Sequence, residues 1–322
     1  ESKFPTAWKK ALVTPVYKKG ERELCSNYRP ISLLSCVGKV FERCMHKYIY
    51  NFLILNSLIS KAQSGFLSGD STINQLLSIY TAMCTFFDSG ITSQSIYFDI
   101  SKAFDRVWHK GLLHKLNAIG IRGKVLNFLE NYLHDRTQVV VLKNEKSSPM
   151  TVLAGVPQGS VLGPLLFVVF INDIVQNIVS IIKLFADDTS MSYGDEDPIR
   201  RAEVLNTDLR TIEHWAHLWK VTFNDTKTEL LNIKRGNGPI YPLNFGTSQL
   251  QEAMHHKHLG IIFQDNCKWD EHIKYIAGKV KLLLNCLKSL KYKLNRKSLD
   301  IMYKSFILPI FDYADILYDN CT

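Results

Sequence analysis

The sequence has no long hydrophobic run. Its longest apolar stretch, residues 161–171, contains Gly163 and Pro164 and is far shorter than the roughly 20 residues that cross a bilayer. No internal repeat or low-complexity segment is present either. A length of 322 residues with 46% hydrophobic and 21% charged content is typical of a folded protein with a large core. We therefore expect one elaborate domain or a few joined subdomains, and no membrane partner.

Paired cysteine motifs are also absent. The seven cysteines are scattered and never form a C-x-x-C pattern, which argues against a disulfide framework and a zinc ribbon. The pattern predicts a reducing compartment, so we expect an intracellular protein of the nucleus and cytoplasm. The chain starts with Glu1 and shows no positive segment followed by an apolar one, as a secretory signal would. We expect a fragment of a longer protein.

Acidic residues are in deficit. Thirty-nine Lys and Arg residues against 30 Asp and Glu residues give a net charge of +9. This surplus favours a polyanionic partner, either nucleic acid or an acidic membrane surface, and the missing membrane span weakens the second option. Lysines are frequent between Lys274 and Lys304, among apolar residues at helical spacing. A helix with one basic face is common in other proteins, so this region only supports the nucleic-acid interpretation.

Hydrophobic periodicity predicts alternating helices and strands. Helices are expected over residues 37–55, 73–87, 124–132, 164–174 and 200–218, and from residue 270 onward. Strands are expected over residues 95–99, 138–142, 229–233 and 259–263, with a hairpin-like element within residues 14–33 and a loop at 236–239. Residues 181–193 are expected to form two short strands joined by a turn. This mixture indicates an α+β fold.

Three acidic residues lie where strands are predicted to end. Asp99 closes an apolar run, and Asp187 and Asp188 occupy the turn of the next predicted strand pair. Nucleotide addition to a 3′ end uses two divalent cations about 3.5–4 Å apart, and such hard cations prefer carboxylate oxygens. Neighbouring residues of a strand face opposite ways, so a turn has to reorient one of the pair, and we expect Asp187 to be the stronger ligand.

A second interpretation of this acidic pair is structural. An isolated Asp-Asp pair in a turn usually caps backbone amides. Here, however, an apolar strand leads into the pair, and charges near an apolar interior are rare unless a cation compensates them. The chemical interpretation requires the three acids to meet in space.

Several strings resemble the motifs of one enzyme family. Phe98-Asp-Ile-Ser-Lys-Ala-Phe-Asp-Arg-Val, Gly155-Val-Pro-Gln-Gly-Ser-Val-Leu-Gly-Pro and Phe185-Ala-Asp-Asp look like the palm motifs of reverse transcriptases, specifically those of non-LTR (LINE-type) retrotransposons. The resemblance extends over nearly the whole chain through Asn27-Tyr-Arg-Pro-Ile-Ser-Leu, Gln63-Ser-Gly-Phe, Trp219 with Asn224 and Lys227, and Leu259-Gly followed by Trp269 and His272. The family often has basic residues where this chain has Leu67 and Asp70, so template contact by that segment is left open.

The resemblance implies a right-hand polymerase. We expect fingers over residues 1–90, a palm with an antiparallel sheet, packed helices and interleaved fingers segments over 91–265, and a partial helical thumb over 266–322. The implied activity is RNA-directed DNA polymerisation, which adds deoxynucleotides to a primer 3′ end on an RNA template during retrotransposition. Endonuclease and other regions of the parent polyprotein are expected outside this chain. The alternatives are a decayed or domesticated nucleic-acid-binding fragment, an intron-maturase-like reverse transcriptase and an RNA-dependent RNA polymerase.

The resemblance also implies roles for individual residues. Two Mg²⁺ ions, for which Mn²⁺ can substitute, are expected on Asp99, Asp187, Asp188 and the backbone carbonyl of Ile100, with Lys227 as a proton donor near the leaving pyrophosphate. The expected contacts of the deoxynucleoside triphosphate are Lys18 or Lys19, Arg29, Phe104 and Gln158. The expected contacts of the RNA template and the DNA primer or target are Gly155, Pro157, Gly159, Leu259 and Gly260.

Some of these residues also have purely structural explanations. Phe104, five residues after Asp99, is expected to lie under the sugar and exclude a 2′-hydroxyl, but a Phe at helical spacing is often an ordinary core residue. Gly155 and Gly159 would allow close backbone approach to a template base pair, or would simply form a turn. For Lys19 the alternative explanation is solvated surface charge. Ser160 is expected to cap the following helix.

Overall fold

The computed structural model describes residues 3–234 and 238–318, which fall into two compact units. Unit 1 comprises residues 1–66, 100–177 and 212–223, and unit 2 comprises residues 67–99, 178–211 and 224–322. Each unit is therefore assembled from three separate chain segments. The boundaries predicted at residues 90 and 265 separate fingers, palm and thumb rather than these compact units, and they stay a prediction. The loop predicted at 236–239 lies partly outside the described residues.

Unit 1 is built on a small mixed sheet. Its strands run in the order β2-β1-β4-β5, and β6 also pairs with β4. The bounds are β1 (Lys10–Tyr17), β2 (Tyr28–Leu33), β4 (Thr137–Leu142), β5 (Glu145–Lys146) and β6 (Met150–Thr151). Strands β1 and β2 pair in antiparallel fashion, which confirms the hairpin-like element predicted within residues 14–33. Strand β4 joins β1 in parallel, a pairing that local sequence does not signal.

Helices pack beside this sheet within unit 1. They are η1 (Thr6–Lys9), η2 (Cys25–Asn27), α1 (Cys36–Leu55), η3 (Ala103–Arg106), α3 (His109–Ala118), α4 (Gly123–Leu133), α5 (Leu162–Ile171), η4 (Asn172–Val175) and the last turns of α6 (Pro198–Trp219). Every residue of α5 except Pro164 is buried, as expected for a helix that is apolar all round.

The start of α5 is capped by two side chains. Ser160 Oγ accepts a hydrogen bond from the Gly163 amide at 3.0 Å, which confirms the predicted cap. The carboxylate of Glu42, from α1, accepts bonds from the amides of Val161 and Leu162 at 2.7 and 3.1 Å. A buried carboxylate at a helix N-terminus satisfies free amides and is stabilised by the helix dipole. The loop before α5 is thereby held to α1.

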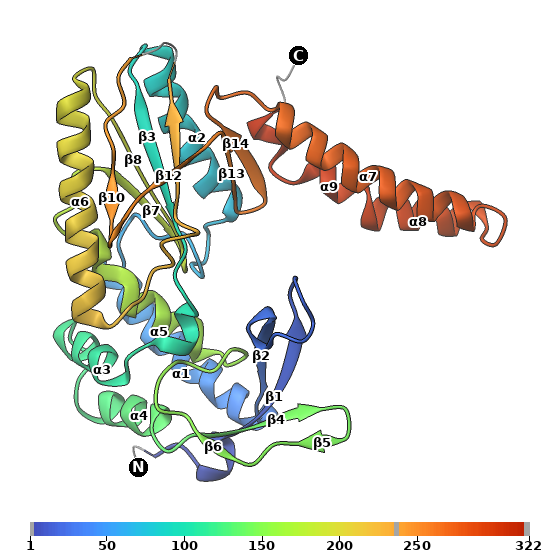
Figure 1. The fold of residues 1–322 in the computed structure, drawn as a ribbon. Helices are drawn as coiled ribbons and strands as arrows, with labels where there is room; N and C mark the ends of the chain where they lie inside the picture. Colours follow the sequence, from blue (N-terminus) through green and yellow to red (C-terminus); the bar gives the residue numbers. More distant parts are fainter. Residues whose placement is uncertain (1–2, 235–237, 319–322) are drawn as a thin grey trace. The chain divides into compact units, whose positions relative to one another are not determined.

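Unit 2 contains a second five-stranded sheet, which is antiparallel except for the parallel pair β12–β9. Its order is β12-β9-β3-β8-β7, and all six residues of the central strand β3 are buried. The bounds are β3 (Ser93–Phe98), β7 (Ile181–Phe185), β8 (Asp188–Gly194), β9 (Glu229–Ile233) and β12 (Gln251–Ala253). Figure 1 shows α2 (Thr72–Asp88) and α6 on opposite sides of this sheet. Burial on both faces encloses even the polar residues of β3, and the side chains of Gln94 and Ser95 form hydrogen bonds with those of Asn232 and Ser192.

The C-terminal part of unit 2 adds small hairpins and helices. The elements are β10 (Asn244–Phe245), β11 (Ser248–Gln249), β13 (His255–His258), β14 (Ile261–Gln264), α7 (Asp270–Leu290), α8 (Arg296–Phe306), α9 (Leu308–Asp312) and η5 (Asp315–Leu317). Helices α7 and α8 lie side by side (Figure 1). One apolar cluster joins Leu76 of α2, Tyr97 of β3, Phe263 of β14 and Trp269, so the start of α7 is anchored to the sheet.

One predicted strand differs from the structure. Residues 259–263 were expected to be extended, but Leu259 and Gly260 form the turn of the β13–β14 hairpin, in which His258 pairs with Ile261. Both turn residues have positive φ, 45° and 94°. A two-residue turn of this kind matches the twist of antiparallel strands, and Leu at such a position gives no local signal for it. Among the described residues, no helix has both the length and the apolarity needed to cross a membrane.

Candidate active site

Two of the three predicted catalytic acids lie at matching ends of neighbouring strands in unit 2. Strand β3 pairs with β8 in antiparallel register, and the last pair joins Phe98 to Thr189. Asp99 directly follows Phe98, and Asp188, the first residue of β8, directly precedes Thr189, so an extension of this register by one position sets the two acids opposite each other. Residues opposed in this way have Cβ atoms roughly 4.5–5.5 Å apart. The register therefore brings together residues that are 89 positions apart in the sequence.

The third acid, Asp187, lies in the turn between β7 and β8. Phe185 pairs with Asp188, so Ala186 and Asp187 alone make the turn. Ala186 is buried and has a φ of 57°, a left-handed conformation that is uncommon for a residue with a side chain. This turn removes Asp187 from the strict alternation of a strand, as the sequence analysis required. Asp187 is half-buried, whereas Asp188 is exposed.

Lys227 lies beside the first of these acids. Its Nζ is 3.8 Å from Asp99 Oδ2. A turn based on Asn224 positions it, because the Asn224 carbonyl accepts bonds from the amides of Lys227 and Thr228. The Asn224 amide in turn donates to the carbonyl of Asp99 at 2.8 Å. Asn224 and Lys227, which belong to one predicted motif, therefore both contact the end of β3. Asn224 does so through its backbone amide and Lys227 through its side chain.

The donor atoms at this strand end suit divalent cations of the magnesium type, since carboxylate oxygens are their preferred ligands. Within residues 3–234 and 238–318, however, no three Asp, Glu, His or Cys residues are grouped as ligands of one ion. Asp99 is instead paired with the ammonium group of Lys227. The acids are aligned by strand register, and the assignment of two ions to them stays a prediction.

The backbone carbonyl of Ile100 was predicted as a further ligand. Ile100 forms an isolated antiparallel bridge with Phe223. The hydrogen bonds around this bridge come from Ser101 to Thr222 and from Asn224 to Asp99, not from Ile100 itself. In such a non-hydrogen-bonded pair, the carbonyl of the central residue points away from its partner strand. The Ile100 carbonyl therefore forms no hydrogen bond with Phe223 in this bridge.

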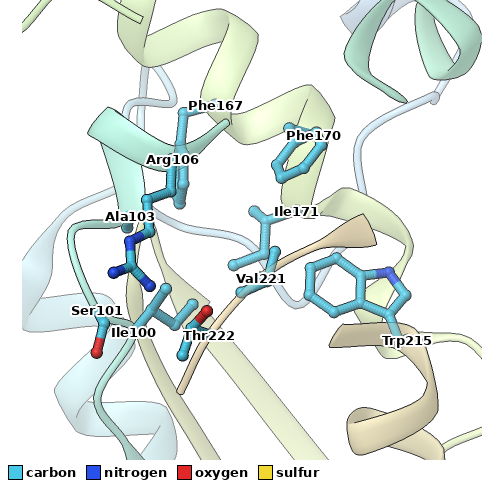
Figure 2. A pocket seen from close by; sticks show the side chains of 10 residues that line it. All are labelled: Ile100, Ser101, Ala103, Arg106, Phe167, Phe170, Ile171, Trp215, Val221 and Thr222. Carbon is cyan, nitrogen blue, oxygen red and sulfur yellow. The ribbon is translucent and has the colours of Figure 1, made fainter. Parts of the chain in front are cut away.

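A small cavity in unit 1 lies next to Ile100. Figure 2 shows it lined by Ile100, Arg106, Phe167, Trp215 and Val221 among other residues. Its volume is about 10 Å³, which is room for one water molecule at most. This cavity is consequently a packing defect behind the chain segment that follows β3, and it is too small to be a nucleotide site.

Phe104 is held between two other rings in unit 1. Its ring stacks on Phe167 of α5 at a centroid distance of 4.5 Å and meets Phe66 edge to face at 6.1 Å. Phe104 itself is half-buried, so one part of the ring remains accessible. The structure therefore gives this residue a packing role and also fixes the ring in one place. The predicted exclusion of a 2′-hydroxyl is not tested by these contacts.

The two glycines of the 155–159 loop make close contacts with the protein's own backbone. A Cβ at Gly155 would lie 2.6 Å from the Asp105 carbonyl oxygen, and a Cβ at Gly159 would lie 2.6 Å from the Ser32 carbonyl oxygen. Both have positive φ, 88° and 121°. These contacts are sufficient to explain both glycines, so template approach at Gly155, Pro157 and Gly159 stays a prediction.

Gln158, in the same loop, is fixed at its main chain and its side chain. Its carbonyl accepts a bond from the Ser32 amide of β2 at 2.7 Å. Its Nε2 donates to Asp105 Oδ1 at 2.9 Å. Burial raises the pKa of Asp105, while the Gln158 bond and the nearby Lys102 oppose this effect. Asp105 was not among the predicted site residues, although it lies within the Ala-Phe-Asp-Arg-Val string that resembles a palm motif.

The basic residues of the β1–β2 hairpin are exposed. Arg29 pairs with Val16, and the Lys18 amide donates to Asn27 one step further along the ladder. Opposed residues and alternate residues share a face, so Lys18 and Arg29 lie on the same face of the hairpin. Among the described residues, no carboxylate lies within ion-pair distance of Lys18, Lys19 or Arg29. The structure thus favours Lys18 over Lys19 as the partner of Arg29.

The predicted primer contacts, Leu259 and Gly260, are braced by a tyrosine. Tyr313 Oη donates to the Leu259 carbonyl at 2.6 Å, and a Cβ at Gly260 would meet the Tyr313 ring at 3.1 Å. Tyr313 belongs to the C-terminal segment of unit 2, which the sequence analysis did not connect with this turn. Tyr313 and Leu259 are 54 positions apart, so no local sequence pattern predicts their contact.

Comparisons with known proteins agree with the geometry. The sequence model of the family described as reverse transcriptase (RNA-dependent DNA polymerase) matches residues 16–280. The chain is 31% identical over 97% of its length to the probable RNA-directed DNA polymerase from transposon X-element of Drosophila melanogaster, and covers 35% of that protein. It is 28% identical over 98% of its length to the RNA-directed DNA polymerase from mobile element jockey of Drosophila melanogaster, and covers 36% of that protein. The chain thus spans about a third of the length of these relatives.

A solved structure shares the fold. Telomerase from Candida tropicalis, in complex with a TWJ fragment of telomeric RNA, matches with a TM-score of 0.57 at 10% identity. The match covers 98% of this chain and 55% of that chain. At this identity the likeness concerns the fold alone, and it confirms the predicted α+β right-hand polymerase architecture.

Proposed function

The chain belongs to the reverse transcriptase (RNA-dependent DNA polymerase) family, and from this premise we propose that it adds deoxynucleotides to a primer 3′ end on an RNA template during the replication of a non-LTR retrotransposon. The observation that carries the proposal is the β3–β8 register, which sets Asp99 opposite Asp188 and beside the turn that holds Asp187. Relatives named as RNA-directed DNA polymerases of mobile elements support it.

In this proposal Asp99, Asp187, Asp188 and the Ile100 carbonyl hold two Mg²⁺ ions, with Mn²⁺ as a substitute. Bound there, the ions would activate the primer hydroxyl and neutralise charge on the triphosphate and the leaving group. The protein's own part is alignment, since strand register and the two-residue turn place the carboxylates before any ion arrives. Lys227 donates a proton to the departing pyrophosphate, and its pairing with Asp99 keeps the ammonium group close to the reacting end.

We propose that residues of unit 1 select and hold the deoxynucleoside triphosphate. Arg29 and Lys18 bind its phosphates, a task suited to a forked guanidinium and a point charge on one hairpin face. In this proposal the ring of Phe104, which stacks on Phe167, excludes the 2′-hydroxyl of a ribonucleotide. Gln158 contributes hydrogen bonds from its carboxamide.

The RNA template and the DNA primer are assigned to two backbone segments. The Gly155-Val-Pro-Gln-Gly159 loop, whose glycines and Pro157 leave few side-chain atoms, would meet the template base pair. The Leu259-Gly260 turn would support the primer end. Free thiols among the described cysteines fit the intracellular location that we propose, in nucleus and cytoplasm.

Primer extension on an RNA template in Mg²⁺ tests the proposed function. Wild-type protein should extend a DNA primer with deoxynucleotides, and Asp187→Ala should abolish extension while leaving primer–template binding in place. Glu203→Gln, which alters an exposed carboxylate on α6, serves as the control and should extend normally. Wild-type protein that binds primer–template but extends no better than Asp187→Ala would favour the decayed-element alternative. Preferential use of ribonucleotides would favour an RNA polymerase.

A further inference from the structure

A partly buried contact in unit 1 links the nucleotide-binding candidate Gln158 to a carboxylate with no assigned role. Gln158 Nε2 donates to Asp105 Oδ1 at 2.9 Å. We propose that Asp105 is a positioning residue, which fixes the orientation of the Gln158 carboxamide so that its Oε1 acceptor faces the incoming nucleotide. This inference rests on the proposed function, and it adds a residue and a mechanism to it.

The main chain around this contact is held on two sides. The Ser32 amide donates to the Gln158 carbonyl, which ties the loop to β2. The amides of Gly155 and Val156 donate to the carbonyls of Val107 and Phe104 at 2.9 and 2.8 Å, which ties the loop to the η3 segment. The backbone of Gln158 is therefore fixed, and rotation of its side chain is the freedom that remains.

The chemistry of the two groups removes that freedom. A carboxamide has a donor end and an acceptor end of nearly the same shape, so packing alone does not distinguish the two orientations. An ionised carboxylate only accepts hydrogen bonds, and it therefore selects the NH₂ end of Gln158. Oε1 is then directed away from Asp105, as a fixed acceptor. A site that needs an acceptor at one place gains from such preorganisation.

Protonation of Asp105 would weaken this selection. A neutral carboxyl group can donate as well as accept, so it tolerates either end of the amide. Burial raises the pKa of Asp105, and the Gln158 bond and Lys102 act in the opposite direction. Nucleotide binding should therefore weaken on acidification at a higher pH than for an ordinary aspartate, and Asp105→Asn should lose this dependence.

A double-mutant cycle separates positioning from a general structural role. We expect Asp105→Ala to raise the KM for deoxynucleotides about three- to tenfold, the factor that one net hydrogen bond is worth, with a smaller change in kcat. If Asp105 acts through Gln158, the same change in a Gln158→Ala background should have no further effect. Glu130→Gln, which alters an exposed carboxylate on α4, is the control and should leave KM unchanged. An equal rise in KM in both backgrounds would overturn the proposal.

A second measurement does not depend on catalysis. In protein labelled with ¹⁵N-glutamine, the side-chain NH₂ signal identified as Gln158 by its loss in Gln158→Ala should shift as Asp105 titrates. The shift should vanish in Asp105→Asn, while the other glutamine signals stay in place. A Gln158 signal that is the same with and without Asp105 refutes the positioning role. If the wild type fails to extend primers but the signal still responds to Asp105, the proposed function fails and the positioning contact stands.

Discussion

Gly155 and Asp105 are in contact through their main chains, and a Cβ on Gly155 would lie only 2.6 Å from the Asp105 carbonyl oxygen. The atoms that block it are backbone atoms of a segment held by its own hydrogen bonds, so they have little room to retreat. The φ of 88° at Gly155 adds a second obstacle, because residues with side chains rarely adopt it. The close approach of the 155–159 loop to the η3 segment therefore requires glycine at position 155.

Gly155→Ala should destabilise the protein by about 2–4 kcal/mol, since it combines overpacking with backbone strain. Gly123→Ala is the matched control, because Gly123 has a φ of 59° but nothing within 4 Å of the added Cβ. It should cost only about 1 kcal/mol. Denaturant unfolding measures both values, and equal losses would show that the contact with Asp105 adds no cost.

Lys227→Met should lower kcat about a hundredfold through loss of the proposed proton donor. Its ion pair with Asp99 joins two groups that are 66% and 44% exposed, so the free energy of unfolding should change by less than about 1 kcal/mol. Single-turnover primer extension and denaturant unfolding measure the two effects. Lys124→Met, at an exposed position on α4, is the control. A normal rate in Lys227→Met would remove this residue from catalysis.

Phe104→Ala should increase ribonucleotide incorporation, because the ring proposed to exclude the 2′-hydroxyl is lost. Phe66→Ala removes only the edge-to-face neighbour and should relax sugar selection to a smaller degree. The ratio of kcat/KM for a ribonucleotide and its deoxynucleotide reports the effect independently of any general loss of activity. An unchanged ratio in Phe104→Ala would leave this ring with its packing role alone.

Lys115 should make stability depend on pH. Its ammonium group pairs with Asp173, bonds to the Phe170 carbonyl at 2.6 Å and lies 3.8 Å from the Trp219 ring centroid. Burial lowers its pKa to about 8 from 10.5. Between these values the unfolded chain holds the proton more often than the folded one, so this group makes the free energy of unfolding rise with pH.

Comparison with Lys115→Met isolates this contribution. The free energy of unfolding of the wild type, measured from pH 7 to 9.5, should rise relative to that of the variant. A difference between the two proteins that stays constant across this range would show that Lys115 keeps an ordinary pKa. Other ionisable groups titrate in the same range, which is why the difference, rather than the wild-type curve, is the quantity to measure.

Much of the fold follows from local pattern. Apolar periodicity located α1, α2, α4 and α6 to within a few residues, because each helix has a face that must be buried. The apolar run that ends at Asp99 and the acidic turn at Asp187 became β3 and the β7–β8 hairpin. The Ser160 cap was likewise predictable, since it acts on an amide three residues away.

Contacts between distant segments were not predictable in this way. Glu42 caps a helix about 120 positions further along the chain, and Asp105 meets Gln158 across 53 positions. No periodicity connects such pairs, because they depend on how whole elements dock. The turn at Leu259 was missed for a different reason. Its left-handed conformation is imposed by strand pairing on a residue that does not favour it.

The central position of β3 has a consequence for how the acids are kept in line. Two like charges repel each other, so Asp99 and Asp188 do not stabilise the register between β3 and β8. Their alignment comes from apolar neighbours such as Ile96 and Leu184, which are fully enclosed. Sliding β3 by a single residue would turn Ile96 to the opposite face of the sheet and out of the enclosed position it occupies. Substitutions deep in the interior can therefore disable the acids without approaching them.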